Sequence, residues 1–218
     1  MGGRSESVEE YLEVMFKLSR TVGGITVGRL ATELHVAPSS VSEMVGRLAA
    51  LGLAERRADG GICLTAGGER EGAALVRRHR LSERLLADVL ALPWDRVHDE
   101  ACRFEHVLSP EVEALVVERL GNPATCPHGH AIPDELGAVV EAPARPLAEL
   151  DAGERGVIAR VDEGEPELLR YLASLGMFPE ACVSVESVAP FGGPQLVRVG
   201  DAQYALGREV AARVFVKV

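Results

Sequence analysis

Aromatic residues and long apolar runs are scarce in this sequence. Phe, Tyr and Trp account for 4% of the 218 residues, although hydrophobic residues together account for 47%. Any core must therefore be built mainly from aliphatic side chains, and the length allows more than one core. No run is long enough for a membrane span, and the first residues lack the apolar region of a secretory signal. We expect a soluble, cytoplasmic protein without membrane contact.

The sequence also lacks closely spaced cysteine pairs and an excess of positive charge. The four cysteines (Cys63, Cys102, Cys126 and Cys182) form no Cys-x-x-Cys pair, which argues against a disulfide framework. The net charge of −10 argues against a chain that coats nucleic acid indiscriminately. The charge is uneven, however. The first 70 residues carry eight basic and nine acidic side chains, so most of the acidic excess lies later in the chain.

Side chains that bind metals are concentrated in residues 78–106. They are His79, Glu83, His98, Cys102, Glu105 and His106. Residues three or four apart share one face of a helix, so Cys102, Glu105 and His106 can converge on one ion. A thiolate, a carboxylate and an imidazole together suit a borderline divalent transition metal. Each residue alone is more simply a buried structural group, but their combination favours a metal site.

Three further ligand-type residues lie in a loop rich in Pro and Gly. They are Cys126, His128 and His130. The sequence does not favour a metal site in this loop, and their role stays open. Glu10 and Glu13 belong to an acidic first helix, where charged faces are usually solvated.

The N-terminal part has the pattern of a winged helix. Apolar spacing predicts a helix over residues 7–20, and two short helices over 26–36 and 37–53 are joined by a tight turn. A hairpin follows, with Asp59-Gly60-Gly61 as its turn. A helix-turn-helix followed by a hairpin indicates contact with DNA. The candidate DNA-binding residues are Thr26, Ser39, Ser40, Ser42, Arg47, Arg56 and Arg57.

The rest of the chain divides into a helical region and a β-rich region. Helices are predicted over residues 66–91, 94–106 and 110–120, because Pro93 and Pro110 mark boundaries between them. Beyond residue 140 a Pro-containing linker leads into five short β-like segments separated by Gly-rich turns. This alternation predicts a small closed β-barrel with one helix. The fold class is therefore mainly α with β.

Several segments together resemble the diphtheria toxin repressor family of iron- or manganese-dependent repressors. They are R-R-H-R-L-S-E-R-L-L, L-P-W-D-R-V-H-D-E-A-C-R-F-E-H and T-C-P-H-G-H-A-I-P. The resemblance covers nearly the whole chain and implies a homodimer. It also implies a winged-helix domain (1–73), a helical dimerisation and metal-binding domain (74–140) and an SH3-like domain (146–218). In the last, L-G-M-F-P-E-A-C-V-S-V and A-P-F-G-G-P also resemble small proteins of ferrous-iron transport.

The resemblance further implies two metal sites per subunit. One joins Glu10 to Cys102, Glu105 and His106, with Glu13 as a weaker candidate. The other joins His79, Glu83 and His98 to the third domain, where Glu165 matches one ligand position. The second matching position is Leu168, which cannot bind a metal, so neighbouring Glu167 is a weaker candidate.

The ligand types favour Mn(II), with Fe(II) as a close alternative. Iron-type relatives carry Met where this chain has Glu10, whereas manganese-type relatives have carboxylates matching Glu10 and Glu13. Carboxylate oxygens favour harder ions such as Mn(II), but the thiolate of Cys102 favours Fe(II), Co(II) or Zn(II).

We therefore expect a metal-dependent repressor of metal uptake and homeostasis genes. One or two dimers are expected to bind a palindromic double-stranded operator, because operator symmetry matches dimer symmetry. Two alternatives are a metal-dependent hydrolase and an iron-trafficking protein. The sequence contains no evident nucleophile or phosphate-binding loop, so we expect no enzymatic activity. It specifies neither the operator nor the target genes.

Overall fold

The computed structural model describes residues 5–218, which divide into two compact units. The first unit contains the chain up to His79 together with Glu105–Leu108 and Pro133–Val139. The second unit contains Arg80–Phe104, Ser109–Ile132 and Val140–Val218. The limits of the three domains expected from the sequence stay a prediction.

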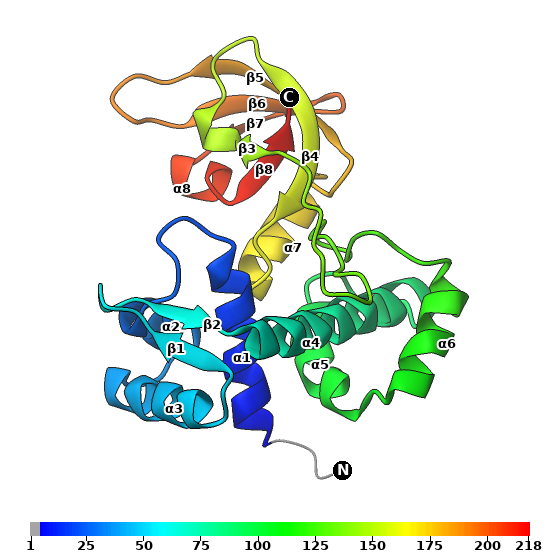
Figure 1. Ribbon diagram of the computed structural model, residues 1–218. Coiled ribbons are helices and arrows are strands. Elements are labelled where there is room, and N and C mark those ends of the chain that lie inside the picture. The colour runs from blue at the N-terminus through cyan, green and yellow to red at the C-terminus, as the bar shows by residue number, and fades with distance from the viewer. Residues whose placement is uncertain (1–4) are drawn as a thin grey trace. The chain divides into compact units, whose positions relative to one another are not determined.

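The first unit is a winged helix. Its elements are α1 (Glu6–Ser19), α2 (Val27–Glu33), α3 (Pro38–Ala50), β1 (Ala54–Arg56) and β2 (Ile62–Leu64), all drawn in Figure 1. The hydroxyl of Thr26 accepts from the backbone N–H of Arg29 and so caps α2, and Pro38 occupies the first turn of α3. An aliphatic core that includes Leu12, Leu30 and Leu48 holds the helices against the hairpin. The predicted helix-turn-helix and wing are confirmed.

Helix α4 (Ala66–Arg84) packs unusually closely against α1. A Cβ on Gly72 would lie 2.8 Å from Cβ of Phe16 and 3.0 Å from the carbonyl oxygen of Leu12. Only glycine allows this approach without a shift of one helix. The contact places the buried face of α1 beside the middle of α4.

The helices of the second unit depart from the predicted bounds. The last turn of α4 widens into a π-type turn, η1 (Leu85–Val89), and α5 (Val97–Phe104) begins three residues later than expected. A 3-10 turn, η2 (Glu105–Val107), follows α5 in the chain and belongs to the first unit. Helix α6 (Pro110–Leu120) begins at a Ser109 cap and ends at Gly121 in the left-handed conformation, as the sequence predicts.

The C-terminal part of the second unit is a six-stranded antiparallel sheet in the order β3-β8-β4-β5-β6-β7 (Figure 1). Its elements are β3 (Arg145–Pro146), η3 (Leu147–Glu149), β4 (Arg155–Val161), α7 (Pro166–Ser174), β5 (Cys182–Val188), β6 (Gln195–Val199), β7 (Ala202–Leu206), α8 (Arg208–Ala211) and β8 (Val214–Lys217). A bulge between Ile158 and Arg160 bends β4 near its end. The SH3-like prediction is confirmed. In the part of the chain that the structure describes, β7 does not pair with β3, so the sheet is open rather than the closed barrel predicted from the sequence, and it packs on an aliphatic core.

Across residues 5–218 the structure contains no helix that is long and apolar enough to cross a membrane.

Candidate metal centres

The first unit brings two carboxylates and an imidazole together in a buried cluster, the first centre. Glu13 comes from α1, His79 from α4 and Glu105 from η2. Nδ1 of His79 lies 2.5 Å from Oε2 of Glu105 and 3.7 Å from Oε1 of Glu13. All three side chains are buried, and their ligand atoms lie within 4.8 Å of one another. Carboxylate oxygens and an imidazole nitrogen at this spacing fit a divalent transition metal.

The two carboxylates of the first centre have opposite pKa shifts. Burial alone would raise the pKa of Glu13, but the Lys17 ammonium, 2.8 Å away, and His79 lower it to about 2. Burial raises the pKa of Glu105 to about 7; the charge of Glu13 adds to this shift and His79 opposes it. The centre therefore holds a proton on Glu105 near neutral pH, and a divalent cation can replace that proton.

His106 lies at the edge of the first centre. Its Nε2 is 3.8 Å from Oε1 of Glu105, and its Nδ1 is 2.7 Å from Oε2 of Glu9. Of the neighbouring acids on α1, Glu13 is buried, Glu9 is half-buried and Glu10 is exposed. The structure therefore brings Glu9 to His106 and Glu13 to the cluster, while Glu10 faces solvent.

The second unit holds another cluster, the second centre, which contains Glu83, Cys126, His128 and Glu163. Oε1 of Glu83 lies 3.4 Å from Nδ1 of His128, and Oε2 of Glu163 lies 3.8 Å from the same nitrogen. The thiol of Cys126 is 3.9 Å from Oε2 of Glu163. His98 adjoins this cluster, with Nδ1 3.2 Å from Oε1 of Glu83. Two carboxylates, an imidazole and a thiol form a second set of metal-ligand atoms.

The loop that carries Cys126 and His128 is attached to β4. The backbone N–H of Val161 donates to the carbonyl oxygen of His128 at 3.0 Å, and Nε2 of His130 contacts the Val161 carbonyl oxygen at 2.9 Å. Gly129, at φ 93°, lies so close to the backbone of β4 that a Cβ on it would be 2.1 Å from the carbonyl oxygen of Ala159. Glu163 follows two residues after β4. The sheet therefore positions both the loop and Glu163.

The charges of Glu83 and Glu163 act on both the thiol and the imidazole of the second centre. Burial raises the pKa of the Cys126 thiol well above its ordinary value, and the charges of Glu83 and Glu163 raise it further. Burial alone would lower the pKa of His128, but Glu83 and Glu163 raise it above its ordinary value. A metal ion at this position would stabilise the thiolate against the two carboxylates.

Three other residues that the sequence singled out lie outside the buried clusters. Glu165 is exposed, and its Oε1 accepts from the Arg213 guanidinium at 2.7 Å. Glu167 is exposed on α7. Cys102 is exposed on α5, with Sγ 3.9 Å from Nε2 of His98. Glu163, rather than Glu165, is the carboxylate that lies near Glu83 and His128, and the predicted ligand role of Glu165 stays a prediction.

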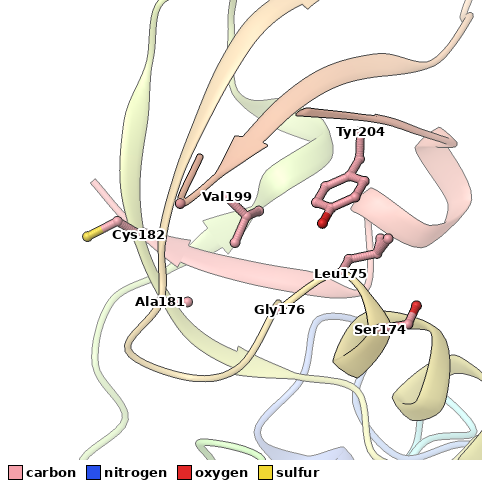
Figure 2. Close-up of a pocket in the computed structure, with 8 residues that line it drawn as sticks. Ser174, Leu175, Gly176, Ala181, Cys182, Val199 and Tyr204 are labelled. Carbon is pink, nitrogen blue, oxygen red and sulfur yellow. The ribbon is translucent and has the colours of Figure 1, made fainter. Parts of the chain in front are cut away.

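A pocket in the β-rich part has neither a carboxylate nor an imidazole in its lining. Its lining comprises Ser174, Leu175, Gly176, Ala181, Cys182, Val199, Gly200 and Tyr204. In Figure 2 the Tyr204 ring lies near Leu175, whereas the Cys182 side chain points away from both. The pocket is lined by no carboxylate or imidazole, so it does not belong to either centre.

The winged helix presents an exposed polar surface on α3 and the wing. Ser39, Ser40, Ser42 and Arg47 are exposed on α3, whose Val41, Val45 and Leu48 face the core. Arg56 donates to the carbonyl oxygen of Ser42 at 3.3 Å and so connects β1 with α3. Arg57 is exposed near the hairpin turn, beside Asp59. Hydroxyls and guanidinium groups on one helix and wing suit contact with bases and phosphates.

Comparison with known protein families gives three adjoining matches. Residues 4–62 match the iron-dependent repressor N-terminal DNA-binding domain, and residues 65–134 match the metal-binding and dimerisation domain of the same repressors. Residues 145–218 match the FeoA domain.

Individual relatives match over most of the chain. The iron-dependent repressor IdeR of Mycobacterium bovis is 38% identical over 226 residues, covering 97% of this chain and 97% of the relative. The diphtheria toxin repressor of Corynebacterium diphtheriae is 39% identical over 136 residues, covering 61% and 59%. A solved manganese-dependent transcriptional repressor in complex with manganese is 34% identical with a TM-score of 0.89, covering 96% and 98%. The T. acidophilum IdeR structure is 29% identical with a TM-score of 0.80, covering all of both chains.

Proposed function

The chain belongs to the family of iron-dependent repressors that includes IdeR and the diphtheria toxin repressor, and on this premise we propose that two metal centres control its binding to DNA. It is a metal-dependent, DNA-binding transcriptional repressor with a C-terminal FeoA domain. No comparison favours a hydrolase or an iron-trafficking protein. We propose that it has no enzymatic activity and acts in the cytoplasm.

We assign the first centre to the ligands Glu13, His79 and Glu105, with His106 at its edge. The observation that carries this assignment is the buried cluster in which α1 of the winged helix meets α4 and η2. A divalent cation would replace the proton on Glu105 and add to the positive charge that Lys17 supplies to Glu13. Glu13 then holds α1 against His79 of α4, which fixes the winged helix in one arrangement. If that arrangement also binds DNA better, metal and operator tighten each other's binding.

We propose Mn(II) as the ion of the first centre, with Fe(II) as the alternative. Two carboxylates and one imidazole are ligands that Mn(II) accepts well. Glu10 is exposed, so Glu13 is the better candidate for the metal-binding carboxylate of the first helix, where iron-type relatives use a Met. The related manganese-dependent repressor in complex with manganese supports the same choice.

We assign the second centre to Glu83, Cys126, His128 and Glu163, with His98 beside Glu83. The softer donor Cys126 suits Fe(II), Co(II) or Zn(II) better than Mn(II). The two centres therefore differ in ligand chemistry as well as in position. The FeoA domain contributes Glu163 directly and attaches the Cys126–His130 loop to β4.

We propose that the repressor binds a palindromic operator as a homodimer, with one or two dimers per operator. The match to a metal-binding and dimerisation domain supports this assembly. In the same region, Leu90 of the second unit and Val112 and Leu115 of α6 are exposed apolar side chains. A two-fold interface would bury such side chains and would set the spacing of the operator half-sites.

The test is operator binding at controlled metal concentration. A duplex selected from random sequence by the metal-loaded protein is titrated with protein in chelator, Mn(II), Fe(II), Co(II) or Zn(II), without oxygen. We expect Mn(II) or Fe(II) to tighten binding about 5–150-fold, the range of ordinary allosteric coupling. Equal affinity in chelator and in every metal would exclude metal control. Activation by Zn(II) alone would exclude the assigned ion.

A further inference from the structure

Trp94, the only tryptophan in the sequence, contacts the loop that supplies Cys126 and His128. Its indole N–H donates to the carbonyl oxygen of Pro127 at 3.0 Å. Its backbone carbonyl oxygen lies 3.1 Å from Nε2 of His128. The Trp94 and His128 rings also lie against each other, with centroids 5.1 Å apart and an interplanar angle of 42°. Trp94 therefore touches two consecutive residues of this loop in three ways.

These contacts determine which nitrogen of His128 is available to a metal. A carbonyl oxygen can only accept, so Nε2 of His128 carries the proton that it donates to Trp94. In the neutral imidazole that a metal requires, Nδ1 is then the lone-pair nitrogen, and it faces the carboxylates of Glu83 and Glu163 at 3.4 and 3.8 Å. Fixing the tautomer and ring orientation of a ligand histidine in this way is how neighbouring groups tune metal sites.

Trp94 also contacts the FeoA domain. Its ring meets the Phe178 ring edge-on, with centroids 4.9 Å apart and an interplanar angle of 62°. The adjacent Asp95 accepts from the Arg170 guanidinium of α7 at 3.0 Å. Trp94 also packs against the aliphatic core of the sheet. One side chain thus contacts both the metal-ligand loop and the domain that supplies Glu163.

We propose that Trp94 is a positioning residue of the second centre, and that its contact with Phe178 makes metal affinity there depend on the FeoA domain. This inference rests on the second centre proposed above. The indole holds the Cys126–His128 segment through Pro127, while its backbone sets the His128 tautomer. Residues of this kind, in contact with ligands rather than with metal, typically change metal affinity by about 10–100-fold when replaced.

The second centre offers a spectroscopic signal of its own. Bound to a thiolate, Co(II) gives a charge-transfer band in the near ultraviolet. Titrating Co(II) into the full chain carrying Cys102→Ser leaves Cys126 as the thiol beside these ligands. Because Trp94 is the only tryptophan, its emission reports the same site. Co(II), with a partly filled d shell, should quench that emission, whereas filled-shell Zn(II) should not.

Two variants and one matched control test the positioning role. Trp94→Phe keeps an aromatic ring but removes the donor to Pro127, and Phe178→Ala keeps Trp94 but removes its edge contact. Phe191→Ala is the control, because Phe191 lies in the same domain with its side chain fully exposed. We expect each test variant to weaken Co(II) binding at Cys126 by about 10–100-fold. Phe191→Ala should bind as the parent does.

The outcomes separate this inference from the proposed second centre. If the parent shows no thiolate band, or if Cys126→Ser leaves the band unchanged, the second centre itself is wrong. If the band is present and both test variants bind within twofold of the parent, Trp94 does not position the loop. Mn(II) affinity of the first centre, measured by electron paramagnetic resonance, is the internal control. An equal loss at both centres would also overturn the proposal, because it indicates general destabilisation.

Discussion

Nδ1 of His79 and Oε2 of Glu105 lie 2.5 Å apart inside the first centre, in side chains that water does not reach. Their contact joins α4 to the short turn η2, and the same Nδ1 lies 3.7 Å from Oε1 of Glu13 of α1. Burial of this pair is what holds Glu105 near its neutral form. We therefore expect the first centre to respond both to metal and to pH.

Glu13→Gln should weaken Mn(II)-dependent operator binding strongly, whereas Glu10→Gln should have little effect. Both changes remove one negative charge from α1, but only Glu13 is buried beside His79. Loss of a direct ligand should cost at least as much as the about 10–100-fold typical of residues around a metal site. Mn(II) titration of operator binding measures both variants against the parent. Equal effects of the two variants would indicate that Glu10 is also a metal ligand.

The stability of the metal-free protein should fall as pH rises from about 4.5 to about 7. In that window folded Glu105, with its pKa raised to about 7, keeps a proton that the unfolded chain has lost. Stability therefore decreases with increasing pH until Glu105 is ionised. Glu13, whose pKa is lowered to about 2, has the opposite effect in a separate window, because its contribution is lost as pH falls below about 4.5.

Thermal unfolding at pH 5, 6, 7 and 8, with chelator and with Mn(II), would measure this dependence. Mn(II) should remove the decline, because a bound cation replaces the proton and favours ionised Glu105. Glu105→Gln should abolish the decline in chelator, since the amide does not titrate. A parent protein whose stability in chelator increases steadily from pH 5 to 7 would contradict the raised pKa of Glu105.

Much of the winged helix follows from local signals in the sequence. Thr26 and Pro38 mark the starts of α2 and α3, and Asp59-Gly60-Gly61 marks the hairpin turn, so the order and approximate position of these elements could be predicted. The second centre could not be predicted from local signals of this kind. Cys126 and His128 lie in a loop whose conformation is set by hydrogen bonds to β4, about 30 residues later in the chain.

The sequence could not rank Glu163 against Glu165 either. Alignment with the family pattern favours Glu165 as a ligand, whereas the structure places Glu163 near Glu83 and His128. Glu165 is the N-cap residue of α7 and pairs with Arg213. Likewise, periodicity alone could not rank Glu10 against Glu13, because the ranking depends on how closely α1 approaches α4 at Gly72.

Arg47→Ala should weaken binding to operator and to unrelated DNA by similar factors. Arg47 is exposed on α3, where a guanidinium can reach a phosphate without reading sequence. Loss of one phosphate contact should reduce the slope of log affinity against log salt by about 1. Arg103→Ala is the control, because Arg103 is an exposed arginine of α5 outside the winged helix. An unchanged salt slope in Arg47→Ala would remove Arg47 from the DNA contacts.

Gly72→Ala should destabilise the protein, whereas Gly46→Ala should not. Both glycines lie inside helices, where alanine is intrinsically favoured by roughly 0.5–1 kcal/mol. At Gly46 a Cβ would meet nothing within 4 Å, so this gain should appear in full. At Gly72 a Cβ would press on Phe16 and on the Leu12 carbonyl oxygen, and overpacking of this kind costs about 1–3 kcal/mol.

The same pair of variants tests how the first centre depends on helix packing. Gly72→Ala should also weaken Mn(II) binding, because separation of α1 from α4 moves Glu13 away from His79. Urea denaturation in chelator gives the change in stability, and Mn(II) titration by electron paramagnetic resonance gives the change in affinity. Gly46→Ala should leave Mn(II) affinity unchanged. If Gly72→Ala lowers stability but binds Mn(II) as tightly as the parent, then the approach of α1 to α4 does not set the geometry of the first centre, and Glu13 is not held there by Gly72.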